Sequence, residues 1–425
     1  MTRFGDGADQ DHRMALAREW DELVEQARAL PGMRNFLRSA RIERLLPAAM
    51  GGPIVVTNVS GARSDALLIT ESGTDSCPLT ALTVDAAAER LAHYLYRLRG
   101  LDAAAQAFAA ATAAATAEST RANAVAARAA MRRLAEAEAA TDEMLTLLCE
   151  WLWEVCAAPI LERLSWRPQP EGQHGRRLWW CPTGPLTLLP LHAAGYCAGT
   201  DSVLDTCVSS YTPTLQALLD ARATIATERS GQRVLSVTAT EVAGQPRLAA
   251  AGAPALRRLI PAERITAVDN PAATRSRVLS ELVRHQVAHF DCHGYQNLDD
   301  PSSGGLVLAD GAVTILDFAA GAWHGDFAGL AACQTAVGGI DLLDEAITLT
   351  AALHYTGYRH VVGTLWSVRD DITKAVFDAL YESIVIDGTV HADSSATALH
   401  AVVRQQRAVH PTAPRLWAPF IHVGP

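Results

Sequence analysis

The chain has 425 residues, of which 49% are apolar and 19% charged, a balance typical of globular proteins and unlike that of disordered ones. This length predicts two or three structural parts. The net charge is −10 and the arginines are scattered, which argues against a nucleic-acid-binding surface and against docking on an acidic membrane. The start lacks an apolar signal core, and no long uncharged apolar run predicts a membrane span, so we expect a cytoplasmic protein.

Eight cysteines are spread over the chain, at positions 77, 149, 156, 181, 197, 207, 292 and 333. They have neither the close spacing of a disulfide framework nor a CxxC pair. We therefore expect most of them to be reduced thiols that pack as small apolar groups.

The N-terminal third alternates between helical and strand patterns. Residues 9–30 have apolar side chains at helical spacing before Pro31-Gly32, and a short second helix is predicted over 35–46. The β-prone runs 53–59 and 66–70 predict a pair of strands, and 84–99 predicts a helix. Residues 101–140 are mostly alanine and fit either a long helix or a mobile insertion, whereas the large apolar residues of 141–164 predict a helix docked on the core.

From residue 166 onward the pattern is that of an α/β protein. Strands are predicted at 178–181, 233–237, 264–268, 287–291, 327–333, 360–365 and 419–423. Helices are predicted at 213–224, 253–259, 272–285, 342–355 and 371–386. This alternation predicts right-handed crossovers and a mainly parallel sheet covered by helices on both faces, with functional sites at the carboxyl ends of the strands.

Two of these strands end in reactive side chains. One runs VAHFDCHG to His293 and Gly294, and the other runs FAGLAAC to Cys333. If the two strands are parallel neighbours, joined by a hairpin at 305–314 and a helical turn at 315–320, both side chains reach the same edge. An imidazole beside a thiol is the usual means of forming the thiolate nucleophile. The N–H groups of Gly294 and Cys333 would then form an oxyanion hole.

Each of these residues has a structural alternative. A cysteine at a strand end is more often a core residue than a nucleophile, and the same holds for a single histidine. His289, Cys292 and His293 could suggest a metal site, but Cys292 points away from the face that the two histidines share, and no fourth ligand follows. We expect no metal and no cofactor.

At these residues the chain resembles the CHAT domain, a caspase-like module related to separase and caspases. The resemblance extends from about residue 30 to the C-terminus, on the runs GPIVVTNVS, DALLIT, CPTGPLTLLPLHAA, VSSYTPTL, HFDCHG, GLVLADG, LAACQT, YRHVVGTLWSVRDD and LWAPFIHVG. It implies a three-layer α/β/α caspase-like domain at 166–425, preceded by an N-terminal helical segment at 1–50. Residues 51–165 would form the N-terminal part of the module, with the strand pair, the Ala-rich helices and the docking helix.

The resemblance implies a cysteine endopeptidase with His293 and Cys333 as the catalytic dyad. It also implies that 185–194 shapes substrate access and that the loop with Gly338-Gly339 rearranges. Separase-like relatives favour a basic residue before the scissile bond, which requires an acidic pocket residue; Asp370, Asp371 and Asp291 are the candidates. Asp370 and Asp371 equally fit an N-cap of the helix that follows them.

Family members commonly receive an activating signal through helical repeats, and no such array precedes this domain, so we expect either activation by a separate protein partner or a loss of switching. Similar modules occur in bacterial immunity and cell-death systems, which favours a protein substrate in such a system. The alternative is a catalytically inactive CHAT module that acts as a binding adaptor.

Overall fold

The computed structural model describes residues 6–29, 40–168, 175–197, 199–224, 231–243, 245–297, 300–321, 323–332 and 348–425. The chain divides into two compact units, Met1–Pro47 and Ala48–Pro425. The first unit contains helix α1 (Asp6–Ala29), as predicted, and the short helix α2 (Ile42–Leu45). The remainder of the predicted second helix lies largely outside the described residues.

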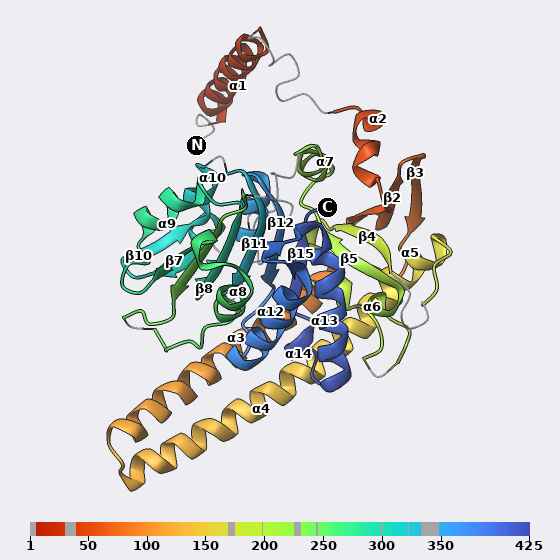
Figure 1. Ribbon diagram of the computed structural model, residues 1–425. Coiled ribbons are helices and arrows are strands. Elements are labelled where there is room, and N and C mark those ends of the chain that lie inside the picture. The colour runs from red at the N-terminus through yellow and green to blue at the C-terminus, as the bar shows by residue number, and fades with distance from the viewer. Residues whose placement is uncertain are drawn as a thin grey trace. The chain divides into compact units, whose positions relative to one another are not determined.

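The second unit is built on one large sheet (Figure 1). Within the described residues thirteen strands form it: β1 (Ile54–Asn58), β2 (Asp65–Thr70), β3 (Gly73–Pro78), β4 (Arg176–Cys181), β5 (Cys207–Tyr211), β6 (Val234–Ala239), β7 (Ile265–Asp269), β8 (Val287–Tyr295), β9 (Gly305–Leu308), β10 (Gly311–Thr314), β11 (Gly325–Ala331), β12 (Tyr358–Thr364) and β15 (Phe420–Val423). β13 (Val385–Ile386) and β14 (Thr389–Val390) form a separate hairpin.

The sheet contains two blocks of parallel strands. β7, β6, β8, β11 and β12 form the first block, and β15, β5, β4 and β1 form the second. The blocks meet where β12 pairs with β15 in the antiparallel sense. The hairpins β2–β3 and β9–β10 extend the sheet with antiparallel strands. The strand pair predicted near the N-terminus is therefore part of the central sheet, because β1 pairs with β4.

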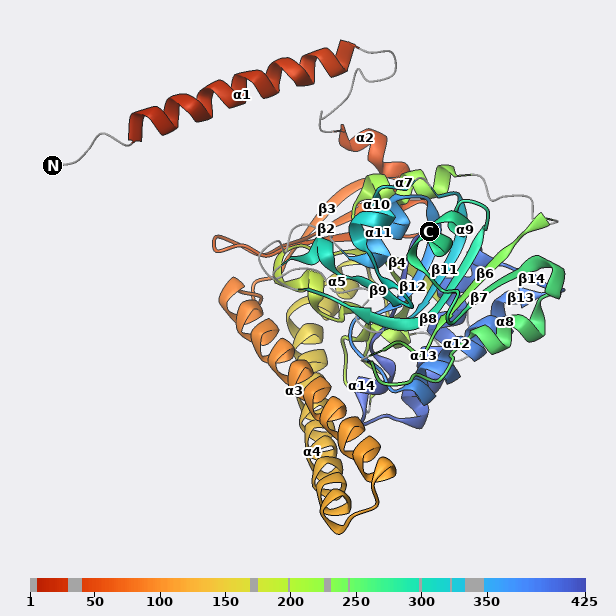
Figure 2. The ribbon, with the colours of Figure 1, turned by 90° about the vertical axis from the view of Figure 1, so that its left-hand side faces the viewer.

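Helices cover both faces of this sheet, which gives the predicted three layers. In the first block α8 (Ala253–Leu259) and α12 (Asp370–Ile384) lie on one face, and α9 (Arg275–Leu282), α10 (Ile315–Ala319) and α11 (Leu349–Tyr355) lie on the other (Figure 2). This division follows from right-handed crossovers, since the chain moves outward from β6 to β7 and then turns back. Apart from the two long helices of the Ala-rich segment, the second unit also contains α5 (Ala158–Arg163), α6 (Val203–Thr206), α7 (Leu215–Ala223), α13 (Ser395–Val409) and α14 (Pro414–Trp417).

The Ala-rich segment forms an antiparallel helical hairpin that extends from the sheet (Figure 1). Its helices are α3 (Val84–Ala117) and α4 (Arg121–Leu152), and the side chains of Thr83 and Thr120 cap their N-termini by accepting backbone N–H bonds. Small alanine side chains allow the two helices to approach closely. Of the two possibilities raised by the sequence, a long helix or a mobile insertion, the structure shows the helical one.

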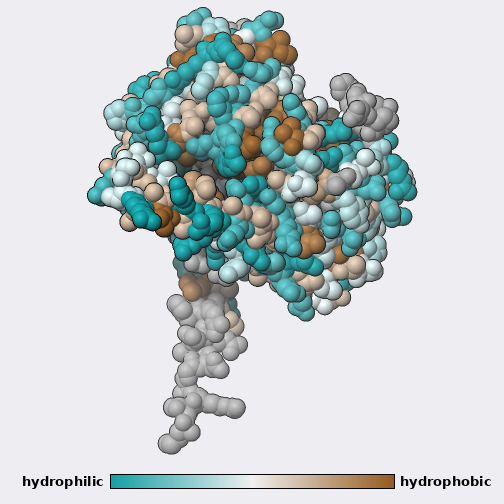
Figure 3. Space-filling view, turned by 90° about the horizontal axis from the view of Figure 1, so that it is seen from below, coloured by the Kyte–Doolittle hydropathy of each residue, from teal (hydrophilic) through white to brown (hydrophobic). Residues whose placement is uncertain are grey.

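The stretch Arg121–Arg163 is long and apolar enough to cross a bilayer by length and composition alone. Of its most apolar 18-residue window, 56% is buried inside the protein, as in the core helix of a globular domain. The face seen in Figure 3 is mixed, with hydrophobic residues gathered in small patches among hydrophilic ones.

The predicted strands and helices after residue 166 are present, with ends that differ by a few residues. The helix predicted at 342–355 begins at Leu349 in the described part of the chain, and 342–347 lie outside it. Sequence patterns missed β5 and α13. α13 has buried Ala396, Leu399, Val402 and Val403 at helical spacing, a signal that would have found it.

Candidate active site

His293 lies near the end of β8, where the strand leaves the core. The strand is buried from Val287 to Cys292, and His293 is partly exposed. Its Nε2 atom is 2.7 Å from the carbonyl oxygen of Pro246. Because a carbonyl oxygen can only accept, Nε2 carries the proton, and in the neutral ring the lone pair is then on Nδ1. Pro246 thus sets the tautomer in which Nδ1 of His293 carries the lone pair.

The strands β8 and β11 are parallel neighbours, which is the condition that the sequence analysis set for bringing their ends to one edge. Their register pairs Val287 with Phe327 and Asp291 with Ala331. The predicted hairpin and helical turn between them are β9, β10 and α10. β11 ends at Ala331, two residues earlier than predicted. Cys333 lies outside the described residues, and so does the predicted loop at Gly338-Gly339.

Gly294 follows His293 directly and is still part of β8. It pairs with Leu306 of β9, so its position is held by an antiparallel strand on one side. A glycine here leaves room beside the backbone N–H that the sequence assigns to an oxyanion hole.

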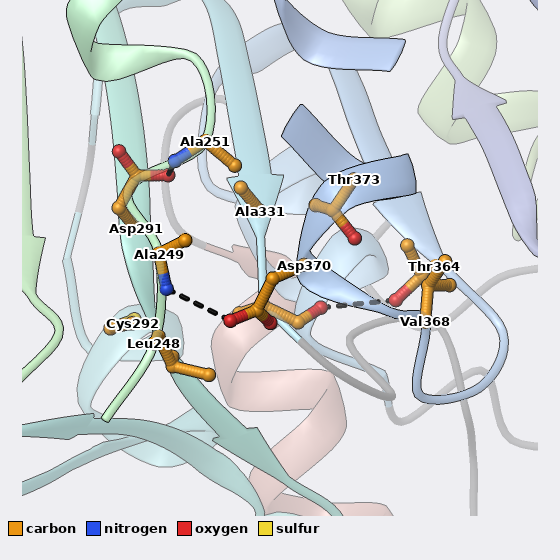
Figure 4. A pocket seen from close by; sticks show the side chains of 11 residues that line it. Leu248, Ala249, Ala251, Asp291, Cys292, Ala331, Thr364, Val368, Asp370 and Thr373 are labelled. Carbon is orange, nitrogen blue, oxygen red and sulfur yellow. Dashed lines mark hydrogen bonds between the residues drawn. The ribbon is translucent and has the colours of Figure 1, made fainter. Parts of the chain in front are cut away.

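A pocket opens where β8, β11 and β12 end (Figure 4). The strands and the residue after β11 line one side of the pocket, with Asp291, Cys292, Ala331, Ala332 and Thr364. The rest of its lining comes from the loop after β6 and from the start of α12, namely Leu248, Ala249, Ala251, Val368, Asp370 and Thr373. The hydroxyl of Thr364 donates to the carbonyl of Ala332 at 3.0 Å, which joins β12 to the end of β11. This is the carboxyl edge at which parallel sheets place their sites.

Asp291 and Asp370 reach this pocket from different sides. Asp291 is 1% exposed, and its two carboxylate oxygens accept the N–H groups of Ala251 at 2.8 Å and Ala253 at 3.2 Å. Asp370 is less buried and accepts the N–H of Ala249 at 2.8 Å through Oδ2 (Figure 4). Both carboxylates therefore also hold the loop that carries Pro246.

Asp371 lies apart from the pocket lining. Its side chain is 60% exposed and forms a bidentate pair with Arg369, which lowers the pKa of Asp371 against the effect of partial burial. The alternative prediction, that Asp370 and Asp371 form the N-cap of the helix, is wrong. α12 begins at Asp370, and the capping position is Arg369. Both carboxylates therefore lie in the first turn, where their negative charge interacts favourably with the helix dipole.

His289 is held in the core beneath the pocket. Its Nδ1 is 2.7 Å from the hydroxyl of Tyr381, and its Nε2 is 2.6 Å from the carbonyl of Ala251 and 3.1 Å from Asp291 Oδ1. Within the described ranges no group of three or more His, Cys, Asp or Glu side chains could hold a metal ion. His289 therefore helps to position the loop and Asp291.

Sequence reasoning missed the loop 245–252. Pro246, Ala249 and Ala251 follow β6, which is the neighbour of β8, so the rule that sites gather at carboxyl ends of adjacent strands could have pointed to them. The segment 185–194, expected to shape substrate access, consists largely of two short 3₁₀ helices packed in the core, and it contributes no residue to the pocket.

A second group of polar side chains lies at and beyond the junction of the two blocks. Ser210 accepts from Arg177 at 2.7 Å and contacts His422 Nδ1 at 2.8 Å, and His422 Nε2 is 3.1 Å from His360 Nδ1. His360 Nε2 is 3.3 Å from Asp393, and Arg359 pairs with the same carboxylate at 2.9 Å. Burial lowers the pKa of both histidines, and the contact with His360 holds the pKa of Asp393 well below its ordinary value. We call this set the buried histidine network.

The comparisons with known proteins agree with this architecture. Chains from two structures of the Saccharomyces cerevisiae separase–securin complex align with TM-scores of 0.52 and 0.53 at 10% identity, covering 90% of this chain. This chain spans only 30% of the length of those chains, and at this identity the likeness concerns the fold. The complex of the pro- and mature domains of Porphyromonas gingivalis RgpB aligns with a TM-score of 0.42 at 11% identity, covering 66% of this chain and 75% of that chain.

No curated protein matches the sequence. The model of the CHAT domain family matches residues 146–425, well over half of the chain and all of the site edge described above. With its three-layer, mainly parallel sheet, this protein has a caspase-like peptidase fold and belongs to the CHAT domain family.

Proposed function

We propose that this protein is a cysteine endopeptidase with Cys333 as nucleophile and His293 as general base. The observation that carries the proposal is the register of β8 and β11. Asp291 pairs with Ala331, and His293 and Cys333 each come two residues later in their chains. Two parallel strands in this register direct the residues that follow toward one edge of the sheet.

The chemistry follows from the tautomer of His293. With Nε2–H donated to Pro246, Nδ1 takes the proton of the Cys333 thiol, and the thiolate attacks the substrate carbonyl carbon. The resulting oxyanion would accept hydrogen bonds from the backbone N–H groups of Gly294 and Cys333. As the intermediate collapses, the imidazolium returns its proton to the leaving amine, and water then hydrolyses the acyl-enzyme with His293 again as the base.

The pocket chemistry supports cleavage after a basic residue. Asp370 and Asp291 bring two carboxylates to a small pocket whose other lining is largely apolar. A lysine or arginine side chain would place its stem on Val368 and Leu248 and its charge near Asp370, whose partly exposed position leaves it more available than Asp291. We assign the specificity role to Asp370 and a supporting electrostatic role to Asp291.

The rival function is that of an adaptor, because a CHAT module can bind a protein without cleaving it. No observation favours this rival over catalysis. For either function we propose a cytoplasmic protein whose partner is another protein, with a separate activating partner and a role in bacterial defence or cell death.

The test is covalent labelling of the full-length protein with an acyloxymethyl ketone peptide that ends in arginine. We expect the probe to form a thioether with Cys333, as shown by peptide mass mapping. Labelling should be lost in Cys333→Ala and in His293→Ala, and it should persist in Cys181→Ala, which removes a buried thiol remote from the pocket.

A positional-scanning peptide library then tests the preferred residue. A preference for acidic or apolar residues before the scissile bond would refute the assignment of Asp370. If Cys333 stays unlabelled by arginine, acidic and apolar probes alike, in cell extract that supplies the native partners as well as in buffer, the endopeptidase proposal is wrong and the adaptor function stands.

A further inference from the structure

The outer half of the α3–α4 hairpin, which extends from the sheet (Figure 1), carries a line of arginines on α4. Arg121, Arg128 and Arg132 lie within a sector of about 40° of the helix surface, because a helix turns by about 100° per residue. Val125 lies beside them and is 57% exposed, and all three arginines are exposed. The buried Ala130 lies on the opposite side of the helix. We call Arg121, Val125, Arg128 and Arg132 the arginine row.

The arginine row lacks charge partners among the residues that the structure describes. None of its three guanidinium groups forms an ion pair or a hydrogen bond there. By contrast, Arg63, Arg163 and Arg275 of the same unit each pair with an aspartate. Residues 103–133 contain four arginines and one glutamate, a net charge of +3, in a chain whose net charge is −10. The outer hairpin is therefore a positive surface on an acidic protein.

The charges of the row do not stabilise the hairpin itself. Arg121 is the first residue of α4, and no acidic residue lies in that first turn. A positive charge at this position is unfavourable, because the N-terminus of a helix already carries a partial positive charge. Arg128 and Arg132 are four residues apart, so their like charges repel each other. An external group with negative charge would relieve both effects.

The surface of the row fits a second helix better than a membrane or a nucleic acid. Between the arginines the helix exposes the small side chains of Ala124, Val125 and Ala135, which allow another helix to approach closely. Helices that lie in a membrane surface have large apolar side chains on one face, whereas the row has Val125 alone. Proteins that bind single-stranded nucleic acids use aromatic side chains for stacking, and the row has none. Its charge therefore favours an acidic helix.

The base of the hairpin contacts the segment that leads into the pocket. The ring of Tyr94, on α3, packs edge-on against the ring of Trp366, with their centroids 5.9 Å apart. Asp142, on α4, accepts a hydrogen bond from the Arg415 side chain at 2.9 Å, and the carbonyl of Arg415 accepts one from Trp366 at 3.1 Å. Trp366 comes two residues before Val368, which lines the pocket. A protein bound along α4 would thus act on an element joined to the pocket by direct contacts.

We propose that the arginine row is the docking surface for an acidic helical segment of a protein partner. The segment lies along α4, and its carboxylates pair with the three arginines. The inference rests on the proposed function in one respect, since it assigns a place to the separate activating partner. Docking itself requires no cleavage and is measured without a substrate. Labelling of Cys333 tests the endopeptidase independently, so failure of one proposal is distinguishable from failure of the other.

The test is the binding of a fluorescent, alanine-based helical peptide to the full-length protein, followed by anisotropy at an ionic strength of about 50 mM. Its glutamates have the spacing of the arginines, four and then seven residues apart, so that it pairs antiparallel to α4. The combined variant Arg121→Gln, Arg128→Gln, Arg132→Gln should bind about 10-fold more weakly, as expected for the loss of three exposed ion pairs. Arg133→Gln, which removes an exposed arginine outside the row, is the matched control and should bind like the wild type.

Two further measurements use the wild-type protein and so do not depend on the folding of the variant. A peptide with glutamine in place of glutamate should bind at least about 10-fold more weakly, and salt at about 0.5 M should weaken the glutamate peptide similarly. Equal binding of the two peptides, or of the wild type and the combined variant, would overturn the proposal. Phosphatidylserine vesicles and poly(U) RNA test the other anionic surfaces. If either binds more tightly than the peptide and loses this binding in the combined variant, the occupant is not a protein helix.

Discussion

The pocket edge and the buried histidine network use the same kinds of side chain to different ends. At the pocket edge, His293 has one nitrogen bonded to Pro246 and is partly exposed, and Asp370 faces space that a ligand can enter. In the network, both nitrogens of His360 and of His422 have partners, and both side chains are at most 2% exposed. The comparison shows two uses of a histidine. A partly exposed ring with a hydrogen bond on one nitrogen is available for chemistry, whereas a buried ring with hydrogen bonds on both nitrogens has a structural role.

The largest expected effect is on catalysis, from a substitution at the pocket edge. In His293→Ala we expect kcat/KM for a cleaved peptide to fall by about 10²- to 10⁴-fold, the usual contribution of a general base. The midpoint of urea unfolding should change little, because the ring is partly exposed and has one hydrogen bond to the part of the chain that the structure describes. His93→Ala, which removes an exposed histidine of α3, is the control and should leave both quantities unchanged. A His293 variant that cleaves normally would remove it from the mechanism.

The next effect is on substrate preference, and it distinguishes the roles of Asp370 and Asp371. Asp370→Asn should lower kcat/KM for substrates with arginine or lysine before the scissile bond by about 10- to 100-fold, since a hydrogen bond to a charged group contributes about 1.5–3 kcal/mol. Asp371→Asn is the matched variant, and its rate should stay near that of the wild type because Asp371 is exposed and paired with Arg369. Equal effects of the two variants on these rates would contradict a specificity role for Asp370 alone.

A substitution in the buried histidine network should change the stability of the fold. His422→Leu keeps the volume but removes one hydrogen-bond partner each from Ser210 and His360, so we expect a loss of about 1–3 kcal/mol in the free energy of unfolding, measured with urea. In contrast to His293→Ala, the folded fraction should retain the wild-type kcat/KM. If His422→Leu abolished cleavage without destabilising the fold, the division between the two regions would be wrong.

The last expected effect is a pH dependence of stability. Burial lowers the pKa of His192, His354 and His400 to about 4, from 6.5. Between these values the unfolded chain binds protons that the folded chain does not, so stability present above pH 6.5 is lost as the pH falls toward 4. Asp142 opposes this trend, because burial raises its pKa to about 6. Urea midpoints at pH 7.5 and pH 5 measure the loss, and His400→Gln should reduce it. A midpoint that rises at pH 5 would reverse the sign assigned here.

Much of this architecture is predictable from the chain alone, because it depends on local patterns. Apolar runs between helix-length segments predict the strands of both blocks except β5, and the run into His293-Gly294 marks a strand end in the sequence itself. The sequence also identifies Asp370 and Asp371 as acidic residues beside a helix start. It does not distinguish them, because their roles depend on a side-chain direction that changes by about 100° from one helical residue to the next.

By itself, the sequence determined the fold class, the family resemblance and the identity of the candidate dyad, since these rest on periodicity and on short motifs. Only the tertiary structure decided that β8 and β11 are neighbours, that Pro246 holds His293, and that Asp291 and Asp370 line one pocket. The reason is physical. Each of these contacts joins residues tens of positions apart, and such distances in the chain are closed by sheet pairing and packing, which no local pattern records.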